Sequence, residues 1–313
     1  MKIVFCGNTF PDMPAYLEQA LDGGHDITVW DGNPETMPTN IDVLIPRALQ
    51  VGAVDMDRGK VRFIQQFGVG LDGVDAAAAR ARGIPVANVP GTGGNADSVA
   101  EHAMLLLLML LRQGVRAQRN VLEGILGAPT GRALSGKTVC LYGLGAVAKA
   151  ISKRLKAFDV RLVGLTRTPD PRKVAEFHLD RCYSMENAQA CFAQTDVLIV
   201  CVKHTPETTG LIDEKQLRLL RPGAVLINIA RAGLIDRTAV ENCLGDGHLS
   251  GVGLDVFWKE PAGIDDPFLQ NPNVMVTPHI AGITDISLGD IARAVAENIR
   301  RFSVGLPLHN AIP

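Results

Sequence analysis

The sequence predicts an α/β protein made of two doubly wound, Rossmann- or flavodoxin-like domains, each built around a parallel sheet. Short β-branched segments alternate with helical stretches along the whole chain. These segments are apolar almost without interruption, which is typical of parallel strands covered on both faces. Two of them, residues 2–7 and 137–142, look like the first strands of separate units. The length of 313 residues also suits two domains of roughly 150 residues.

The predicted strands form two groups. Five lie in the first third of the chain, at residues 2–7, 26–31, 43–46, 62–66 and 86–88. Six follow, at residues 137–142, 161–165, 197–202, 224–229, 251–256 and 273–276. The helical stretches between strands include residues 13–21, 74–82, 149–158 and 237–246.

A longer helix is predicted at residues 98–112. Ser98 and Glu101 fit a capping box at its start, and apolar side chains occupy every face of it. A helix that is apolar all round has to be buried all round. It lies between domains, in a subunit interface, or as an ordinary helix within one core. The glycines and proline of residues 124–136 then predict a loop.

Composition excludes several classes of function. The 31 basic and 33 acidic residues give a net charge of -2, which argues against a nucleic-acid or anionic-membrane partner. The longest apolar run, residues 103–111, is far shorter than the roughly 20 residues that a membrane helix needs. The chain starts directly with a strand and shows no signal peptide, so a cytoplasmic protein is expected. The six cysteines are scattered, and no metal or disulfide site is expected.

A glycine-rich turn after the sixth predicted strand indicates a dinucleotide site. It reads G-x-G-x-x-A from Gly143 to Ala148 and opens a helix. Gly143 permits the tight turn, Gly145 lets the backbone approach a pyrophosphate, and Ala148 permits close helix–strand packing. With Ala146 and Val147, the glycines are predicted to bind phosphates at the helix N-terminus.

The end of the next strand bears on the choice of dinucleotide. NAD sites usually place an acidic residue about 20 positions after the first glycine, on the ribose 2′-hydroxyl. Here Thr166, Arg167 and Thr168 occupy that region without a carboxylate. The guanidinium suits a 2′-phosphate and the threonines add hydroxyls, so NADP(H) is predicted in preference to NAD(H). The alternative is a solvated arginine beside a relaxed NAD(H) site.

Three loops that follow predicted strands each carry one ionisable residue. Residues 228–233 read N-I-A-R-A-G and include Arg231, residues 254–261 read L-D-V-F-W-K-E-P and include Glu260, and residues 277–282 read T-P-H-I-A-G and include His279. The carboxyl ends of parallel strands meet at one edge of a sheet, where α/β proteins bind their ligands. The three side chains are therefore expected to lie together.

These motifs, in this order, resemble the D-isomer-specific 2-hydroxyacid dehydrogenase family over essentially the whole chain. Other segments similar to family signatures are residues 68–72, 88–91, 99–102, 205–208 and 305–310. The resemblance implies a discontinuous substrate domain, residues 1–97 plus 283–313, and a dinucleotide-binding domain, residues 98–282. It also implies a cleft that closes about a hinge between the domains, and a homodimer with the helix near residue 100 at the interface.

The resemblance further implies roles for single residues. Arg231 would hold the carboxylate and carbonyl of a 2-oxo acid, His279 would exchange a proton with the substrate oxygen, and Glu260 would orient His279. The backbone N–H groups of Val69 and Gly70 resemble a second clamp for the carboxylate. Additional cofactor contacts are expected from Val202, Thr208, Ala230 and Asp255.

Two positions depart from the family pattern or leave alternatives open. Lys203 and His204 stand where relatives usually have Pro-Leu, and they are either solvated or add positive charge for the cofactor or an anionic substrate. Arg47 follows the third strand and either contacts the substrate or forms a structural ion pair. The remaining histidines are expected to be structural or solvated: His25, His102, His178, His248 and His309.

The functional hypothesis is an oxidoreductase that transfers hydride between NADP(H) and a small 2-oxo acid, such as glyoxylate or hydroxypyruvate, forming the D-2-hydroxy acid. A second hypothesis is an NAD-dependent relative acting on formate, phosphite or 3-phosphoglycerate. A third is a non-catalytic dinucleotide sensor like the family's co-repressor members. The identity of the oxo acid does not follow from the sequence.

Overall fold

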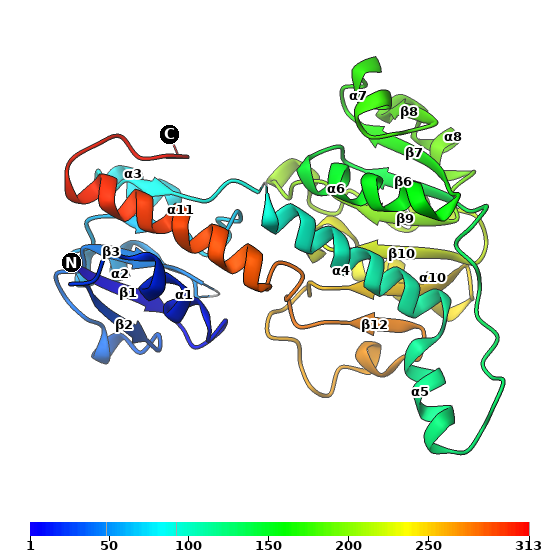
Figure 1. The fold of residues 1–313 in the computed structure, drawn as a ribbon, viewed down its shortest axis with the longest axis horizontal. Helices are drawn as coiled ribbons and strands as arrows, with labels where there is room; N and C mark the ends of the chain where they lie inside the picture. Colours follow the sequence, from blue (N-terminus) through cyan, green and yellow to red (C-terminus); the bar gives the residue numbers. More distant parts are fainter. Residues whose placement is uncertain (48, 92, 313) are drawn as a thin grey trace. The chain divides into compact units, whose positions relative to one another are not determined.

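The computed structural model describes residues 1–47, 49–91 and 93–312, and the chain divides into two units (Figure 1). The first unit contains Met1–Asn95 and Ile283–Pro313, and the second contains Ala96–Gly282. Each unit has one sheet in which all paired strands run parallel. The predicted class, two doubly wound α/β domains, is confirmed.

The first unit is built on a five-stranded sheet in the order β2-β1-β3-β4-β5. Its strands are β1 (Lys2–Cys6), β2 (Asp26–Trp30), β3 (Val43–Ile45), β4 (Ile64–Gln65) and β5 (Val86–Ala87). Its helices are α1 (Met13–Ala20), α2 (Ala53–Gly59), α3 (Ala76–Ala81) and α11 (Asp285–Ser303). The short 3-10 helix η1 (Pro34–Thr36) follows β2.

Alternate side chains of each strand point to opposite faces, so the first sheet supports two separate cores. On one face, Ile3 and Phe5 of β1 pack with Leu17 of α1 and with Val295 and Ile299 of α11. On the other face, Val4 and Leu44 pack with Met56 of α2 and Ala79 of α3. Helix α11, from the end of the sequence, therefore completes the unit that the first residues begin.

The second unit is built on a seven-stranded sheet in the order β12-β11-β10-β9-β6-β7-β8. Its strands are β6 (Thr138–Tyr142), β7 (Arg161–Thr166), β8 (Arg181–Ser184), β9 (Val197–Val200), β10 (Ala224–Asn228), β11 (Leu249–Leu254) and β12 (Val274–Val276). The strand order reverses between β6 and β9, which is the place where sheets of this kind bind ligands.

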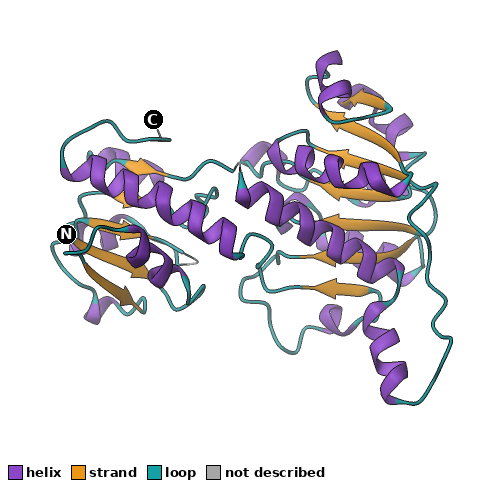
Figure 2. Ribbon diagram, viewed as in Figure 1, coloured by secondary structure: helices purple, strands orange, loops and turns teal. Residues whose placement is uncertain are grey.

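Helices cover both faces of the second sheet. The helices of this unit are α4 (Gly94–Leu111), α5 (Gly114–Leu122), α6 (Ala146–Leu155), α7 (Pro171–Glu176), α8 (Ala188–Phe192), α9 (Glu214–Arg218) and α10 (Arg237–Gly245). The 3-10 helices are η2 (Lys156–Phe158), η3 (Met185–Asn187), η4 (Pro206–Thr208), η5 (Ala232–Leu234) and η6 (Pro267–Gln270). Helices α4 and α6 cross the near face of the sheet in Figure 2 and share one core with its strands.

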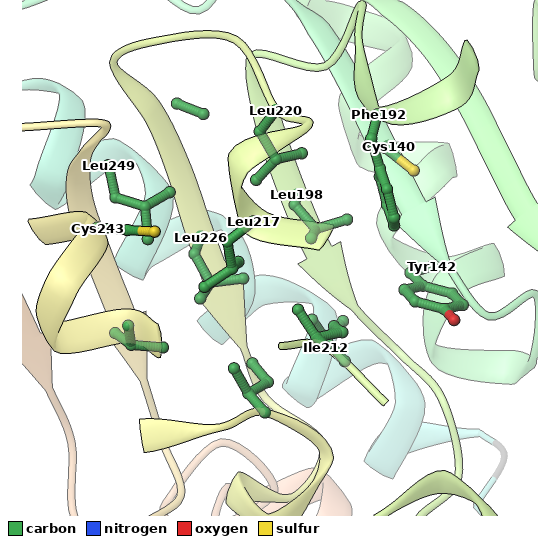
Figure 3. Close-up of a cluster of buried hydrophobic side chains, with 14 of the residues drawn as sticks. Cys140, Tyr142, Phe192, Leu198, Ile212, Leu217, Leu220, Leu226, Cys243 and Leu249 are labelled. Carbon is green, nitrogen blue, oxygen red and sulfur yellow. The ribbon is translucent and has the colours of Figure 1, made fainter. Parts of the chain in front are cut away.

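The opposite face carries a second core, which contains three of the six cysteines, Cys140, Cys191 and Cys243. Figure 3 shows Cys140 and Tyr142 of β6 beside Phe192 of α8, and Cys243 of α10 beside Leu249 of β11. The Cys140 and Cys191 sulfurs lie 3.5 Å apart in this core, and no disulfide links them. These thiols pack as small apolar side chains.

Helix α4 differs from the prediction in its start and its exposure. It begins at Gly94, whose N–H donates to Asp290, so Ser98 lies within the helix and the predicted capping box is wrong. Glu101 instead pairs with Arg154. The helix is not buried all round, because Glu101 and Leu105 are exposed.

In the described residues no single helix is long and apolar enough to span a membrane. Helices α4 and α5 together, bent by 56° at the break between them, meet the length and composition that a span requires.

Candidate active site

The glycine-rich turn joins β6 to α6 and is shaped by close contact with β9. Gly143 has a φ of +94°, and a Cβ there would lie 2.8 Å from the backbone of Cys201. At Gly145, by contrast, a Cβ would meet no described atom within 4 Å. Helix α6 begins directly afterwards, at Ala146 rather than at the predicted residue 149. The N-terminal N–H groups of α6 are therefore approachable beside Gly145, and this open backbone fits a pyrophosphate group.

The predicted 2′-phosphate residues lie next to this turn. Strand β7 ends at Thr166, and the Gly143 N–H donates to Leu165 O, which joins the turn to the strand end. Arg167 and Thr168 are exposed there. The Thr205 hydroxyl and, more weakly, the charge of Arg167 lower the pKa of Glu207. Arg167 therefore lies near the loop that follows β9, at the same edge of the sheet.

That loop carries Val202, Thr208 and the two departures from the family pattern. The Thr208 hydroxyl donates to Lys203 O at 2.9 Å and accepts from the Thr205 N–H at 2.7 Å, so it closes the loop on itself. A cofactor contact from Thr208 or from half-buried Val202 stays a prediction. His204 Nε2 lies 3.0 Å from the Thr209 hydroxyl, and its ring covers Gly233. His204 thus packs against the loop after Arg231, whereas Lys203 is exposed.

The Arg231 loop is held by a buried asparagine that the sequence reasoning missed. Asn228, at the end of β10, has no exposed surface. Its Nδ2 donates to Arg231 O at 2.9 Å, and its Oδ1 accepts from the Ala230 N–H at 3.0 Å. The Ala230 carbonyl accepts from Arg231 Nη1 at 2.8 Å. A polar residue ending an apolar strand was the available signal for this role.

Glu260 and His279 form a hydrogen-bonded pair. Glu260 Oε2 lies 2.8 Å from His279 Nδ1, and both side chains are about one-third exposed, at 34% and 33%. Glu260 Oε1 accepts from the Phe257 N–H at 3.0 Å. Burial raises the pKa of Glu260, but the bond to His279, with a smaller effect of Arg231, leaves the pKa below its usual value. The structure thus brings Arg231, Glu260 and His279 to one edge of the sheet.

Asp255 is buried behind this pair. It is 1% exposed, and its Oδ1 accepts from the Thr277 hydroxyl at 2.6 Å and from the Ile280 N–H at 2.9 Å. Its Oδ2 accepts from the Ala281 N–H at 2.8 Å. All of these bonds are directed to the His279 loop, so the structure gives Asp255 a role in that loop, and a nicotinamide contact stays a prediction.

The remaining predicted substrate residues belong to the first unit. Val69 is exposed, and its carbonyl accepts from Asn88 Nδ2 at 2.7 Å; Gly70 is half-buried beside it. Arg47 is only 8% exposed and donates to Cys6 O at 3.2 Å and Phe10 O at 3.1 Å. Its Nη2 is buried without a partner in the described part of the chain. The hydrogen-bond partners of Arg47 are thus carbonyls rather than the carboxylate of an ion pair, and substrate contact stays a prediction.

Comparison with known proteins decides the family. The model of the NAD-binding domain of D-isomer-specific 2-hydroxyacid dehydrogenases matches residues 104–281. A glyoxylate reductase from Pyrococcus furiosus is 34% identical over 255 residues, which cover 79% of this chain and 74% of that protein.

This chain belongs to the D-isomer-specific 2-hydroxyacid dehydrogenase family.

Other relatives of the chain differ in length. A D-3-phosphoglycerate dehydrogenase from Archaeoglobus fulgidus is 36% identical over 254 residues, which cover 80% of this chain and 47% of the relative. The chain thus spans about half the length of such relatives. The fold of an NADPH-dependent glyoxylate/hydroxypyruvate reductase from Sinorhizobium meliloti matches with a TM-score of 0.84 at 28% identity, covering 99% and 97% of the two chains. The matched NAD-binding domain indicates a nicotinamide dinucleotide as cofactor.

Proposed function

We propose that this 2-hydroxyacid dehydrogenase reduces small 2-oxo acids of the glyoxylate or hydroxypyruvate type to D-2-hydroxy acids, with NADP(H) preferred. The observation that carries the proposal is the 2.8 Å Glu260–His279 pair, at the same sheet edge as Arg231 and the glycine-rich turn. The glycine-rich turn and the end of β7 would hold a nicotinamide dinucleotide, which would supply or accept hydride at the substrate carbon.

Three side chains would bind the substrate, transfer the proton and orient the proton donor. Arg231 has a planar fork of donors that matches a carboxylate and an adjacent carbonyl oxygen. His279 is bonded to Glu260 through Nδ1, so we assign Nε2 as the nitrogen that gives a proton to the ketone oxygen during reduction and takes it back during oxidation. Glu260 stays ionised at neutral pH, because its pKa is lowered, and fixes the imidazole plane.

Turnover of a substrate panel tests the proposal. Oxidation of NADPH and of NADH is followed with glyoxylate, hydroxypyruvate and pyruvate, and the reverse reaction is followed with 3-phosphoglycerate. We expect His279→Ala to lower kcat by roughly 100-fold or more while NADPH still binds. His248→Ala is the matched control, because His248 lies at the amino end of β11, opposite the end that leads to the site, and its Nε2 bonds to Leu217 O. Near-full activity of His279→Ala, or no oxo acid reduced, would contradict the proposal.

The preference for NADP(H) is supported by the exposed Arg167 at the end of β7 and by the lack of a carboxylate in residues 165–169. A cation there stabilises a 2′-phosphate, whereas a carboxylate would repel it. A higher kcat/KM with NADH than with NADPH would overturn the proposed preference for NADP(H).

Oxidation of 3-phosphoglycerate is the second candidate function, since the D-3-phosphoglycerate dehydrogenase from Archaeoglobus fulgidus is 36% identical to this chain.

We also propose that the enzyme is a homodimer. Support comes from α5 and the loop after it, where Val121, Leu122 and Leu126 are 71%, 84% and 92% exposed. Such a group of exposed apolar side chains is typical of a protein interface. Light scattering measures the molar mass of the wild type and of Leu122→Glu, and we expect the variant to dimerise less. A monomeric wild type would contradict the proposed homodimer.

A further inference from the structure

A chain of partly buried polar contacts leads from helix α4 to the His279 loop. His102, on α4, is 11% exposed, and its Nε2 lies 2.8 Å from the Thr277 hydroxyl. The Thr277 hydroxyl donates to Asp255 Oδ1 at 2.6 Å. Since the threonine proton is directed to the carboxylate, His102 Nε2 is the donor to the threonine oxygen. The imidazole thereby fixes the direction in which the hydroxyl points.

The far end of this chain is the turn that carries His279. His279 has a φ of +57°, in the left-handed region that a histidine rarely adopts. The turn is held on both sides of this residue. Before it, the Thr277 carbonyl accepts from the His279 N–H at 2.9 Å, and after it, the Asp255 carboxylate accepts from the Ile280 and Ala281 N–H groups. A strained backbone of this kind persists only where its surroundings determine it.

The apolar surroundings of His102 require its polar atoms to be hydrogen-bonded. The neighbouring α4 side chains Ala103, Leu106 and Leu107 have no exposed surface and pack on the apolar sheet. A polar group buried among such residues destabilises the fold unless it is hydrogen-bonded, and a satisfied network fixes one arrangement of its members. His102, Thr277 and Asp255 satisfy one another in this way.

We propose that His102 is a positioning residue for His279 and acts through Thr277 and Asp255. Its Nε2–H orients the Thr277 hydroxyl toward Asp255, and the oriented carboxylate holds the two amides that follow His279. The imidazole of His279 is then presented at the angle at which Glu260 binds its Nδ1. The catalytic consequence rests on the proposed function, but the consequence for the backbone of the loop does not.

Two pairs of variants test the proposal. His102→Leu and Thr277→Val remove a hydrogen-bonding group at nearly constant volume, whereas His102→Gln and Thr277→Ser keep one. Hydrogen exchange of the Ile280 and Ala281 amides is measured in each. We expect roughly tenfold or faster exchange in the Leu and Val variants, because the hold on these amides weakens, and nearly wild-type exchange in the Gln and Ser variants.

Kinetics form the second readout. In the Leu and Val variants we expect kcat to fall roughly tenfold or more with KM for NADPH unchanged, and the Gln and Ser variants to restore kcat. Leu107→Ala, a buried α4 change outside the network, is expected to lower Tm without changing kcat or the exchange of these two amides.

The proposal is overturned if His102→Leu exchanges and turns over like the wild type, if His102→Gln is as impaired as His102→Leu, or if Leu107→Ala reproduces the effects. A wild type that reduces no 2-oxo acid would refute the proposed function alone, because the exchange measurement needs no substrate.

Discussion

Two buried polar side chains at the ends of neighbouring strands have the same task. Asn228 ends β10 and bonds to the backbone of residues 230 and 231, and Asp255 follows β11 and bonds to the backbone of residues 280 and 281. Each fixes the loop on which a predicted catalytic side chain lies. Bonds from a buried side chain to a loop backbone restrict that loop more than surface contacts do, because water cannot replace them.

Glu260→Gln tests the carboxylate that binds His279. We expect kcat at pH 7 to fall by about 100-fold or more, since the amide cannot stabilise an imidazolium as a carboxylate does. Glu176→Gln, which alters a surface pair with Lys149, is the control and should stay near the wild type. Nearly unchanged kcat in Glu260→Gln would contradict the role.

The same variant has an expected pH signature. The folded-state pKa of Glu260 is lowered, so its ionised form contributes stability above the ordinary carboxyl pKa, and this contribution is lost as the pH falls through the folded value. Between neutral pH and about pH 3, Tm of the wild type should therefore fall more steeply than Tm of Glu260→Gln, as measured by calorimetry. Parallel curves would contradict the lowered pKa.

Arg167→Ala tests the cofactor preference. Loss of a charge-assisted contact of about 1.5–3 kcal/mol should lower kcat/KM for NADPH roughly 10- to 100-fold and leave that for NADH within about threefold. Arg172→Ala is the control, because Arg172 is also exposed but binds Asp170. Equal losses with both cofactors would show that Arg167 does not recognise the 2′-phosphate.

The sequence predicted the functional side chains only where they belong to a recognisable motif. Arg231, Glu260 and His279 were expected to lie together, and they do. The bonds of Asp255 and Thr277 were not predicted, because they depend on how β12 aligns with β11. His102 was expected to be structural or solvated, and its contact with Thr277 joins residues 175 positions apart, which no local pattern reveals.

At the scale of elements, the two glycines of the nucleotide turn separate folding from binding. Gly143 has a positive φ and lies against the backbone of Cys201, directly after β9. Gly145, by contrast, has an ordinary φ of -108° and open space around it. The same turn therefore contains one residue required by the fold and one that is required only by a ligand.

Alanine at each glycine tests this separation. Gly143→Ala should destabilise the protein by about 1–3 kcal/mol or more, because both the φ and the contact are unfavourable. Gly145→Ala should leave Tm nearly unchanged but weaken NADPH binding roughly tenfold, since the methyl group occupies the approach of the pyrophosphate. Calorimetry and fluorescence titration measure the two effects. A stable Gly143→Ala, or a Gly145→Ala that binds normally, would contradict the assignment.

Most strands were predictable because each is a short apolar run, whereas the missed elements lack that pattern. Strand β8 reads R-C-Y-S and lies at the edge of the sheet, where only one neighbour pairs with it, so its burial alternates weakly. Helix α5 exposes most of its side chains, and Asn120 is its one buried residue. In Figure 1 it extends away from the sheet of the second unit, so its sequence does not carry the pattern of a helix that packs on that sheet.

At the scale of the molecule, the chain leaves the first unit after Asn95 and returns to it at Ile283. The second unit is one continuous segment with cores on both faces of its sheet. The first unit is not, because Ile291, Val295 and Ile299 of α11 belong to its core. The two units should therefore differ in their ability to fold alone.

Separate expression tests this difference. We expect residues 96–282 to fold cooperatively and bind NADPH, and residues 1–95 to lack a cooperative transition, because one face of their sheet has lost α11. Thermal melts followed by circular dichroism measure both. Cooperative melting of residues 1–95 would show that α11 is dispensable for this core.

The late position of α11 also sets an order of events on the ribosome. Residues 1–95 emerge first, but the helix that covers Ile3 and Phe5 is made only after the whole of residues 96–282. At about 5–20 residues per second, this interval is on the order of ten to forty seconds. During it only α1 covers this apolar sheet face, so we expect the newly made N-terminal segment to be a substrate for chaperones even though the finished enzyme is not.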